Sequence, residues 1–410
     1  MNITFQSKIK MHRLKSRIED DDEVVIGRVD TGEYILLPKI GIEIIDLLDE
    51  GKSIGEVKHI IEERYCEEVD VLDFAKDLIM DYKFAYMLDG IIVNEQDKTK
   101  DHLAWIPGKV GDYLFGKMGY MIYIVIILSC LFPLVLSEGM VYPHYSDIFI
   151  TSYSSINILL TVSISWFFLG IHEIAHLISA KSLGIGSRIR LSHRLFFMVA
   201  ETNMSNIVLV EPKKRYRAFL AGMALDGMFL SIVFWIQYLH EIGLFSLLPT
   251  TLSIFKLLGY IFFMGLSFQF MFFMQTDIYY TITTFLRCNN LIVNTRLFLM
   301  MKVKKKLTLH QQSEWEGVSL KEKKVIKWYS WVYVLGISWA IIFFLSYTFP
   351  QLIEFYSNSF RSVFKFPFQL WFFIDGIFYL TITSIPFVVV IWSWMRTLKR
   401  NKIRSRSNAL

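Results

Sequence analysis

Six long apolar stretches constrain the fold of this 410-residue chain more than any other feature of its sequence. They cover residues 119–137, 156–180, 218–239, 254–284, 328–348 and 369–395. A helix rises about 1.5 Å per residue, so about 20 apolar residues cross the roughly 30 Å hydrocarbon layer of a membrane. The chain is also 53% hydrophobic, with a mean hydropathy of +0.40, which is unusual for a soluble protein. The sequence therefore predicts a mainly α polytopic membrane protein with about six transmembrane helices.

The distribution of lysine and arginine predicts the orientation of these helices. Eight basic residues lie between Lys181 and Arg217, in the connection after the second apolar stretch. The connections over 138–155 and 240–251 contain none. Basic residues favour the cytosolic side of a membrane. We therefore expect the connection after the second stretch, the basic loop over 291–327 and the basic tail to lie in the cytosol.

An even number of spans then places both termini in the cytosol of a multi-pass cell-membrane protein. Arg361 and Lys365 are the only basic residues expected in an outside loop. The chain begins with charged sequence rather than a basic start and an apolar run, so we expect no cleavable signal peptide. The net charge of +5 is explained by the basic residues of the cytosolic segments, which are attracted to the anionic lipids of the bilayer. It does not indicate a nucleic-acid partner.

The first hundred residues have the pattern of a separate small domain. Two alternating stretches, 23–29 and 33–37, flank Asp30-Thr31-Gly32 and predict a β-hairpin. Apolar residues at helical spacing predict three helices, over 40–48, 54–61 with Ser53 as N-cap, and 71–79. A last strand over 86–93, interrupted by Asp89-Gly90, is expected to rejoin the hairpin. These elements describe a winged-helix-like α+β domain.

The order of these elements resembles the PqqD-like family. The matching segments are the hairpin, GIEIIDLLDEGKSIGEVKHIIEERY (41–65), DFAKDLIMDYKF (73–84) and LDGIIV (88–93). The resemblance implies that residues 12–95 bind the leader region of a ribosomally synthesised, modified peptide by adding it as an extra strand. The alternative is a degenerate winged helix with a regulatory or assembly role. We find no basic recognition helix, so DNA binding is not expected.

The second apolar stretch contains His172-Glu173-Ile174-Ala175-His176. Histidines four residues apart share one face of a helix and can bind Zn²⁺, and Glu173 is placed to accept a proton from water. An ionised group in an apolar span costs about 2.5 to 3.5 kcal/mol, which indicates a function. The alternative is a helix end whose polar groups are solvated at the membrane surface. The three cysteines are widely scattered, which argues against a thiolate zinc site.

A catalytic zinc site usually has three protein ligands, and two aspartates compete for the third position. Asp226 lies in the third apolar stretch and Asp277 in the fourth. Both lie about as far from an inner helix end as His172, roughly 12 to 14 Å along the axis. Depth in the membrane therefore does not choose between them.

The membrane-embedded motif followed by an aspartate on a later span resembles the site-2 protease family of intramembrane zinc metalloproteases. The resemblance implies that His172, His176 and Asp277 bind the metal and that Glu173 is catalytic. Gly222-Met-Ala-Leu-Asp226 is similar in position to the GPxxN-like motif of that family. Proline and asparagine are replaced by Met223 and Asp226, and the glycine expected after Asp277 is Ile278. Asp226 is then expected to support substrate or an intermediate.

Together these patterns predict a membrane-embedded zinc metalloprotease that hydrolyses a peptide bond in the maturation or export of a ribosomally synthesised peptide. Its expected parts are a peptide-recognition domain (1–100), a protease core (115–290), a basic cytosolic loop (291–327) and a C-terminal pair of spans with a basic tail (328–410). One alternative is a regulated protease that cuts a membrane-anchored regulator. Another is a non-catalytic scaffold or immunity protein.

Two further expectations concern single features. The alternation over 187–197 predicts either a strand or re-entrant hairpin that presents an edge to substrate, or a simple interfacial connection. Asp375 in the sixth span is an acid without a visible partner in the sequence.

Overall fold

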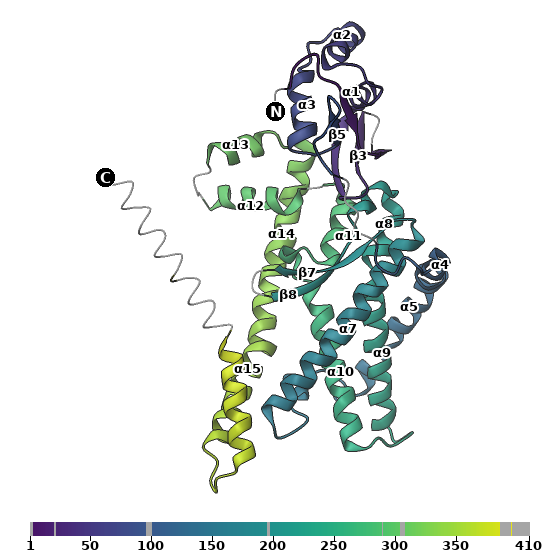
Figure 1. Cartoon of the computed structure of the whole chain (residues 1–410). Helices are drawn as coiled ribbons and strands as arrows, with labels where there is room; N and C mark the ends of the chain where they lie inside the picture. The colour runs from purple at the N-terminus through teal and green to yellow at the C-terminus, as the bar shows by residue number, and fades with distance from the viewer. Residues whose placement is uncertain are drawn as a thin grey trace, which may run out of the picture. The chain divides into compact units, whose positions relative to one another are not determined.

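The chain is mainly helical, with a small strand-containing region at its N-terminus (Figure 1). The computed structural model describes residues 3–19, 22–95, 101–194, 197–288, 290–303, 308–385 and 395. Within these residues, five helical segments are long and apolar enough to cross a membrane: Gly108–Leu136, Ser154–Ser182, Ala221–Glu241, Pro249–Phe268 and Leu320–Val363. Their length and composition make the chain a membrane protein.

The sixth predicted span is described only in part. Leu370–Ile385 is a shorter apolar helix, and residues 386–394 of the predicted span lie outside the described residues. By their contacts, the residues form two compact units. One unit combines Met1–Tyr120 with Glu173–Gly222, and the other combines Met121–His172 with Met223–Leu410.

The N-terminal region of the first unit contains the predicted hairpin and three helices. Strands β3 (Glu23–Arg28) and β4 (Glu33–Pro38) are antiparallel and are followed by α1 (Lys39–Asp49), α2 (Ile54–Tyr65) and α3 (Val71–Met80). Ser53 caps the start of α2, as predicted, and forms a capping box with Glu56 that was not predicted. One face of the sheet and the three helices enclose a core that includes Ile26, Leu48 and Leu78.

The sheet pairing differs from the prediction that the last strand rejoins the hairpin. β5 (Ala85–Leu88) pairs with β6 (Ile91–Ile92) and with an unpredicted strand, β1 (Ile9–Met11). The hairpin instead pairs with a second unpredicted strand, β2 (Leu14–Ile18), in the order β2-β3-β4. β1 has three residues, too few for alternation to identify it, and its side chains Ile9 and Met11 are buried in the core.

The remainder of the first unit consists of segments that come before and after the His172–His176 motif in the chain. It contains α4 (Gly108–Phe115), the C-terminal part of α7 (Ser154–Ser182), the strands β7 (Arg188–Arg194) and β8 (Phe197–Asn203), the 3₁₀ turn η2 (Ser205–Leu209) and α8 (Pro212–Phe219). β7 and β8 pair antiparallel over seven positions, so the predicted hairpin is present. Gly111 is required for the approach of α4 to α7, because a Cβ there would lie 2.2 Å from the Ile178 carbonyl oxygen.

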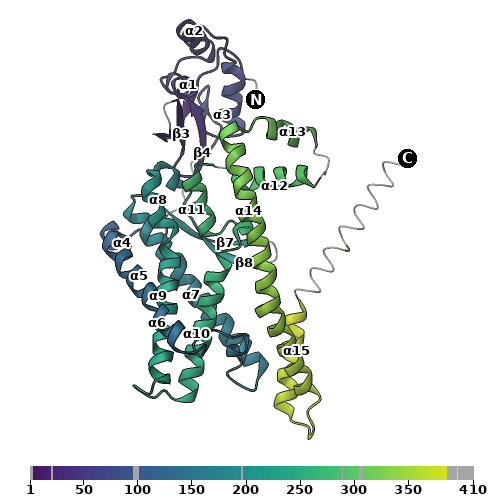
Figure 2. The ribbon, with the colours of Figure 1, turned by 180° about the vertical axis from the view of Figure 1, so that it is seen from behind.

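The second unit is made of helices. Its elements are α5 (Lys117–Ser129) and α6 (Leu131–Leu136), η1 (Tyr145–Ile148), the N-terminal part of α7, α9 (Ala221–Glu241), α10 (Pro249–Phe268), η3 (Phe272–Met274), α11 (Asp277–Leu286), α12 (Leu291–Lys302), α13 (Leu309–Glu316), α14 (Leu320–Phe343), η4 (Phe344–Thr348) and α15 (Phe349–Val363). Figure 2 shows α14 continuing into α15. The predicted fifth span is therefore too short, and Arg361 lies in a helix rather than in a loop.

The predicted fourth span, 254–284, is interrupted. α10 ends at Phe268, and a new helix, α11, begins at Asp277. Gln275 between them has a left-handed backbone conformation with φ of 55°. The apolar composition hides this break because the connecting residues are themselves largely hydrophobic.

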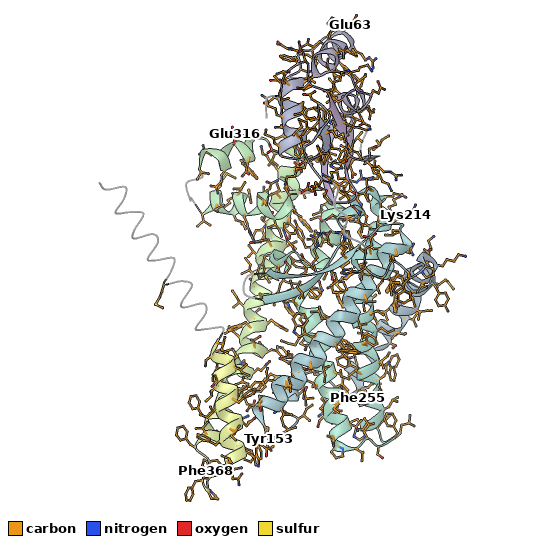
Figure 3. All side chains as sticks on the ribbon, in the orientation of Figure 1. Glu63, Tyr153, Lys214, Phe255, Glu316 and Phe368 are labelled. Atoms are coloured by element: carbon orange, nitrogen blue, oxygen red, sulfur yellow. The ribbon has the colours of Figure 1, made fainter. Side chains whose placement is uncertain are left out.

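Large apolar side chains project outward along the spans, as a membrane protein requires (Figure 3). Val125, Phe167 and Leu335 are each more than 60% exposed.

Asp375 has partners that the sequence does not reveal. Its carboxylate accepts hydrogen bonds from the backbone N–H groups of Ser154 and Ser155, both at 2.9 Å, and from the Ser155 hydroxyl. The first N–H groups of a helix have no partner within the helix. Asp375 therefore caps the start of α7, and the structure gives it a structural role.

Candidate metal centre

The His172–His176 motif lies in the C-terminal half of α7, and its polar side chains are buried. His172, Glu173 and His176 are 6%, 6% and 2% exposed. Because the helix is continuous, the two histidines lie one turn apart on the same face, as their spacing predicts. A buried charged or polar group must be satisfied by partners, so the neighbours of each side chain indicate what the group can do.

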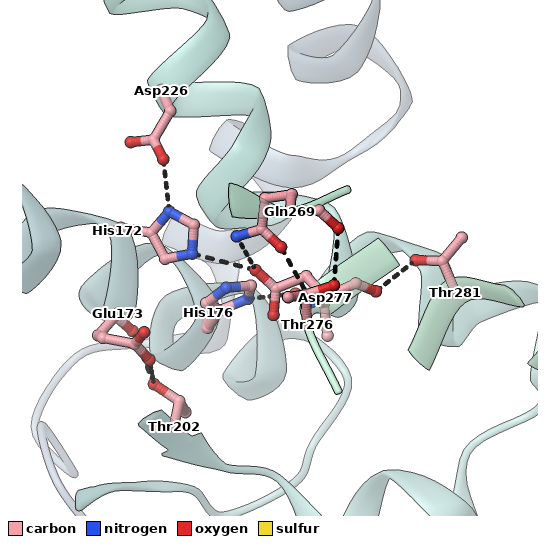
Figure 4. Close-up of polar contacts among 10 residues, drawn as sticks. His172, Glu173, His176, Thr202, Asp226, Gln269, Thr276, Asp277 and Thr281 are labelled. Carbon is pink, nitrogen blue, oxygen red and sulfur yellow. Dashed lines mark hydrogen bonds and ion pairs between the residues drawn. The ribbon is translucent and has the colours of Figure 1, made fainter. Parts of the chain in front are cut away.

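Asp277 lies against the first histidine. His172 Nε2 is 3.1 Å from Asp277 Oδ2, and one ligand atom from each of His172, His176 and Asp277 lies within 4.8 Å of the others (Figure 4). Two ligands bound tetrahedrally to zinc at about 2.0 to 2.1 Å lie about 3.3 Å from each other. The donor types and this separation fit a metal ion, so the three residues form a group that can hold one.

Both histidine rings are oriented by their other nitrogen. His172 Nδ1 lies 2.7 Å from Asp226 Oδ2, and His176 Nδ1 lies 2.7 Å from the backbone oxygen of Ala218. An acceptor at Nδ1 fixes the proton there and leaves the Nε2 lone pair for a metal. Asp226, predicted to support substrate, is thus placed beside a ring of the metal group. Its expected role toward substrate remains a prediction.

Residues in the connection between α10 and α11 hold Asp277 in place. Gln269 Nε2 donates to Asp277 Oδ2 at 3.1 Å, while Gln269 Oε1 accepts from the Asp277 backbone N–H at 3.0 Å. Thr276 Oγ1 donates to the Gln269 carbonyl oxygen at 2.7 Å. Gln269 therefore donates a hydrogen bond to the Asp277 carboxylate and accepts one from a backbone N–H group at the start of α11, where such groups lack a partner within the helix. An acid in the first turn is also favoured by the helix dipole.

Glu173 points to a different partner. Thr202 on β8 lies with its Oγ1 atom 2.7 Å from Glu173 Oε2 and 3.1 Å from the Glu173 carbonyl oxygen. Figure 4 shows Glu173 turned toward Thr202, while the two histidines lie near Asp277. The carboxylate therefore accepts a hydrogen bond from Thr202 and is not one of the three grouped ligand atoms.

The sequence identified the residues of the metal group but missed those that hold them. Gln269 carried a weak signal, since it is a polar residue within a predicted span eight positions before Asp277. Thr202 and the Ala218 carbonyl carried none, because their roles depend on where β8 and α8 lie.

An arrangement without metal is the alternative explanation for these contacts. A protonated imidazole between two carboxylates is stabilised by ion pairing alone. The histidine pair, the third ligand and the oriented rings together are more typical of a metal centre.

Comparisons of the chain with protein-family models, with curated proteins and with solved structures found no match.

Proposed function

We propose that this chain is a membrane-embedded zinc endopeptidase in which His172, His176 and Asp277 hold the metal and Glu173 acts as general base. The observation that carries the proposal is the grouping of these three donors beside a buried, separately held glutamate. Zinc is the proposed metal because two imidazoles and a carboxylate are a common catalytic zinc set.

The chemistry divides between the metal and the chain. A bound zinc ion supplies Lewis acidity, which activates water and polarises a carbonyl group. Glu173 accepts the proton of the attacking water and returns it to the leaving amine, which completes hydrolysis of a peptide bond. The orientation of both rings by Asp226 and Ala218 keeps the ligand nitrogens directed to one point.

The substrate we propose is a precursor peptide recognised by the N-terminal domain. In the sheet β2-β3-β4 the outer strands are β2 and β4, and an outer strand can pair with an added peptide. The helices cover one face of this sheet, so strand addition at an edge is compatible with the packed core. A substrate anchored in the membrane is the second class that the spans allow.

Metal analysis of the full chain purified in detergent tests the proposal. We expect about one zinc per chain in the wild type and in Glu173→Gln, and loss of zinc in His172→Ala, His176→Ala and Asp277→Asn. His59→Ala, at an exposed position of the N-terminal domain, is the matched control and should retain zinc.

Hydrolysis is measured on the same preparations with a library of fluorescein-labelled peptides and mass spectrometry of the products. The wild type should cleave and Glu173→Gln should not, because only the proton acceptor is removed. A wild-type chain free of zinc after reconstitution would support the ion-pair alternative and overturn the proposal. Zinc without any cleavage in the wild type would favour a non-catalytic scaffold.

A further inference from the structure

We propose that Thr202 is a positioning residue that holds the carboxylate of Glu173 in its working orientation. This inference rests on the proposed function, because it assigns a role around the proposed general base. Thr202 does not belong to the motif, lies 29 residues from Glu173 in sequence and comes from a β-strand rather than a membrane helix.

The geometry favours the carboxylate as the partner of the Thr202 hydroxyl. A hydroxyl has one proton to donate, and the two acceptors within reach are Glu173 Oε2 at 2.7 Å and the Glu173 carbonyl oxygen at 3.1 Å. The carboxylate contact is the shorter of the two, and a hydrogen bond to an ionised acceptor is the stronger kind. Among the described residues, no other donor contacts this carboxylate.

A held carboxylate matters because glutamate is flexible. Its side chain has three rotatable bonds, and a general base must lie within hydrogen-bond reach of the proton that it accepts. Threonine is stiff at χ1, so its hydroxyl occupies a defined place on the strand. Thr202 therefore restricts the rotation of Glu173 without removing its ability to accept a proton.

The strand that carries Thr202 is itself held at its end. Thr202 pairs with Ile189, next to the last pair of the hairpin, Arg188 with Asn203. Arg188 Nη2 donates to the Asp30 carbonyl oxygen at 3.1 Å in the N-terminal domain. Asn203 Oδ1 accepts from Ser205 N and Oγ at 2.9 and 2.7 Å. Both strands are thus fixed beside Thr202.

The turn that follows β8 is also bound by the N-terminal domain. Tyr34 Oη donates to Asn206 Oδ1 at 2.7 Å, and Arg17 Nε donates to the Val208 carbonyl oxygen at 2.9 Å. Tyr34 and Arg17 lie on the face of the β2-β3-β4 sheet opposite to the helical core. Burial, and to a smaller extent the charge of Asp30, raises the pKa of Tyr34 to about 12, so its hydroxyl remains a donor at neutral pH. The N-terminal domain therefore contacts the segment that carries Thr202, and Thr202 contacts the proposed general base, Glu173.

Infrared spectroscopy of the metal-free full chain in detergent tests the contact directly. The Glu173 carboxylate band is the one lost in the difference spectrum between wild type and Glu173→Gln. We expect Thr202→Val, which keeps the shape but removes the hydroxyl, to shift this band, and Thr202→Ser to leave it in place. Thr161→Val is the matched control, because the Thr161 hydroxyl on α7 donates to the Asn157 carbonyl oxygen, away from the motif.

Kinetics of the zinc-loaded chain test the consequence. Thr202→Val should lower kcat by about 10- to 100-fold with KM nearly unchanged, while Thr202→Ser should recover most of kcat. Zinc content and melting temperature should match the wild type in both variants. If Thr202→Val does not fold, Thr202→Ala provides the same comparison with serine.

The inference and the proposed function fail in different ways. A band that does not move in Thr202→Val, an unchanged kcat or a serine variant as slow as valine would overturn the role of Thr202. A wild-type chain without zinc or cleavage would overturn the proposed protease, and the infrared comparison would still decide whether Thr202 holds Glu173.

Discussion

The imidazole of His172 is oriented by Asp226, whose Oδ2 atom lies 2.7 Å from His172 Nδ1. The other ring nitrogen lies 3.1 Å from Asp277 Oδ2. Three separate helices, α7, α9 and α11, thus supply the ring and the two carboxylates beside its nitrogens, one of which could bind a metal ion together with the ring. A metal site of this kind depends on its orienting groups as well as on its ligands.

Substitution of Asp226 should weaken metal binding without abolishing it. In Asp226→Ala, His172 Nδ1 loses its acceptor, and we expect zinc affinity to fall by about 10- to 100-fold. Asp226→Asn keeps an acceptor oxygen and should retain zinc and much of the activity. Competition with a chelator measures both variants, with the exposed Asp112→Asn as control. Equal affinities for Asp226→Ala and wild type would show that this contact does not support the metal.

Substitution of Gln269 should weaken both metal binding and stability. Gln269→Leu removes the donor to the Asp277 carboxylate and the acceptor for the Asp277 N–H, and a buried polar group left without a partner costs about 1 to 3 kcal/mol. We expect a lower melting temperature and lower zinc affinity.

The matched control is Gln237→Leu on α9, where the amide donates to the Phe255 carbonyl oxygen. It should lower the melting temperature but leave zinc affinity near the wild-type value. The same loss of zinc in both variants would mean that Gln269 has no particular effect on Asp277.

The N-terminal domain should lose stability as the pH falls below about 6.5. Burial, followed by the charge of Arg28, lowers the pKa of His12 in the folded domain, and these effects exceed the opposing effects of Asp30 and the Asn94 backbone. Between the folded and unfolded pKa values the unfolded chain binds more protons, so the free energy of unfolding decreases with decreasing pH.

Thermal unfolding of a fragment containing residues 1–95 measures this effect, since the buried core of the domain lies within that range. His12→Gln should reduce the slope between about pH 7 and pH 5, whereas His59→Gln, at an exposed position, should not. Equal slopes for wild type and His12→Gln would contradict the prediction. A fragment that remains unfolded would show that the domain needs the rest of the chain.

Reporter fusions should place Lys213 in the cytosol and Ser146 outside. The prediction depends on the eight basic residues between Lys181 and Arg217 and on their absence over 138–155. An alkaline phosphatase fusion should be active at Ser146 and inactive at Lys213. The reverse pattern would invert the orientation and the side from which substrate enters.

Local patterns determined much of this protein. The apolar stretches predicted six spans, and five helical segments among the described residues are long and apolar enough to cross a membrane. The spacing of His172 and His176 placed both on one helical face, because this property depends only on residues close in sequence. The β3–β4 hairpin and the N-cap at Ser53 were predicted for the same reason.

The tertiary structure decided everything that depends on distant residues. The pairing of β5 with β1, the break between α10 and α11, and the cap that Asp375 provides for α7 all follow from contacts between separate segments. Depth in the helices left Asp226 and Asp277 as alternatives, the family resemblance favoured Asp277, and the fold placed one at each nitrogen of His172. Thr202 and Gln269 gave little sign of their roles, because a hydroxyl or an amide acquires a function only when folding brings its partner within hydrogen-bond distance.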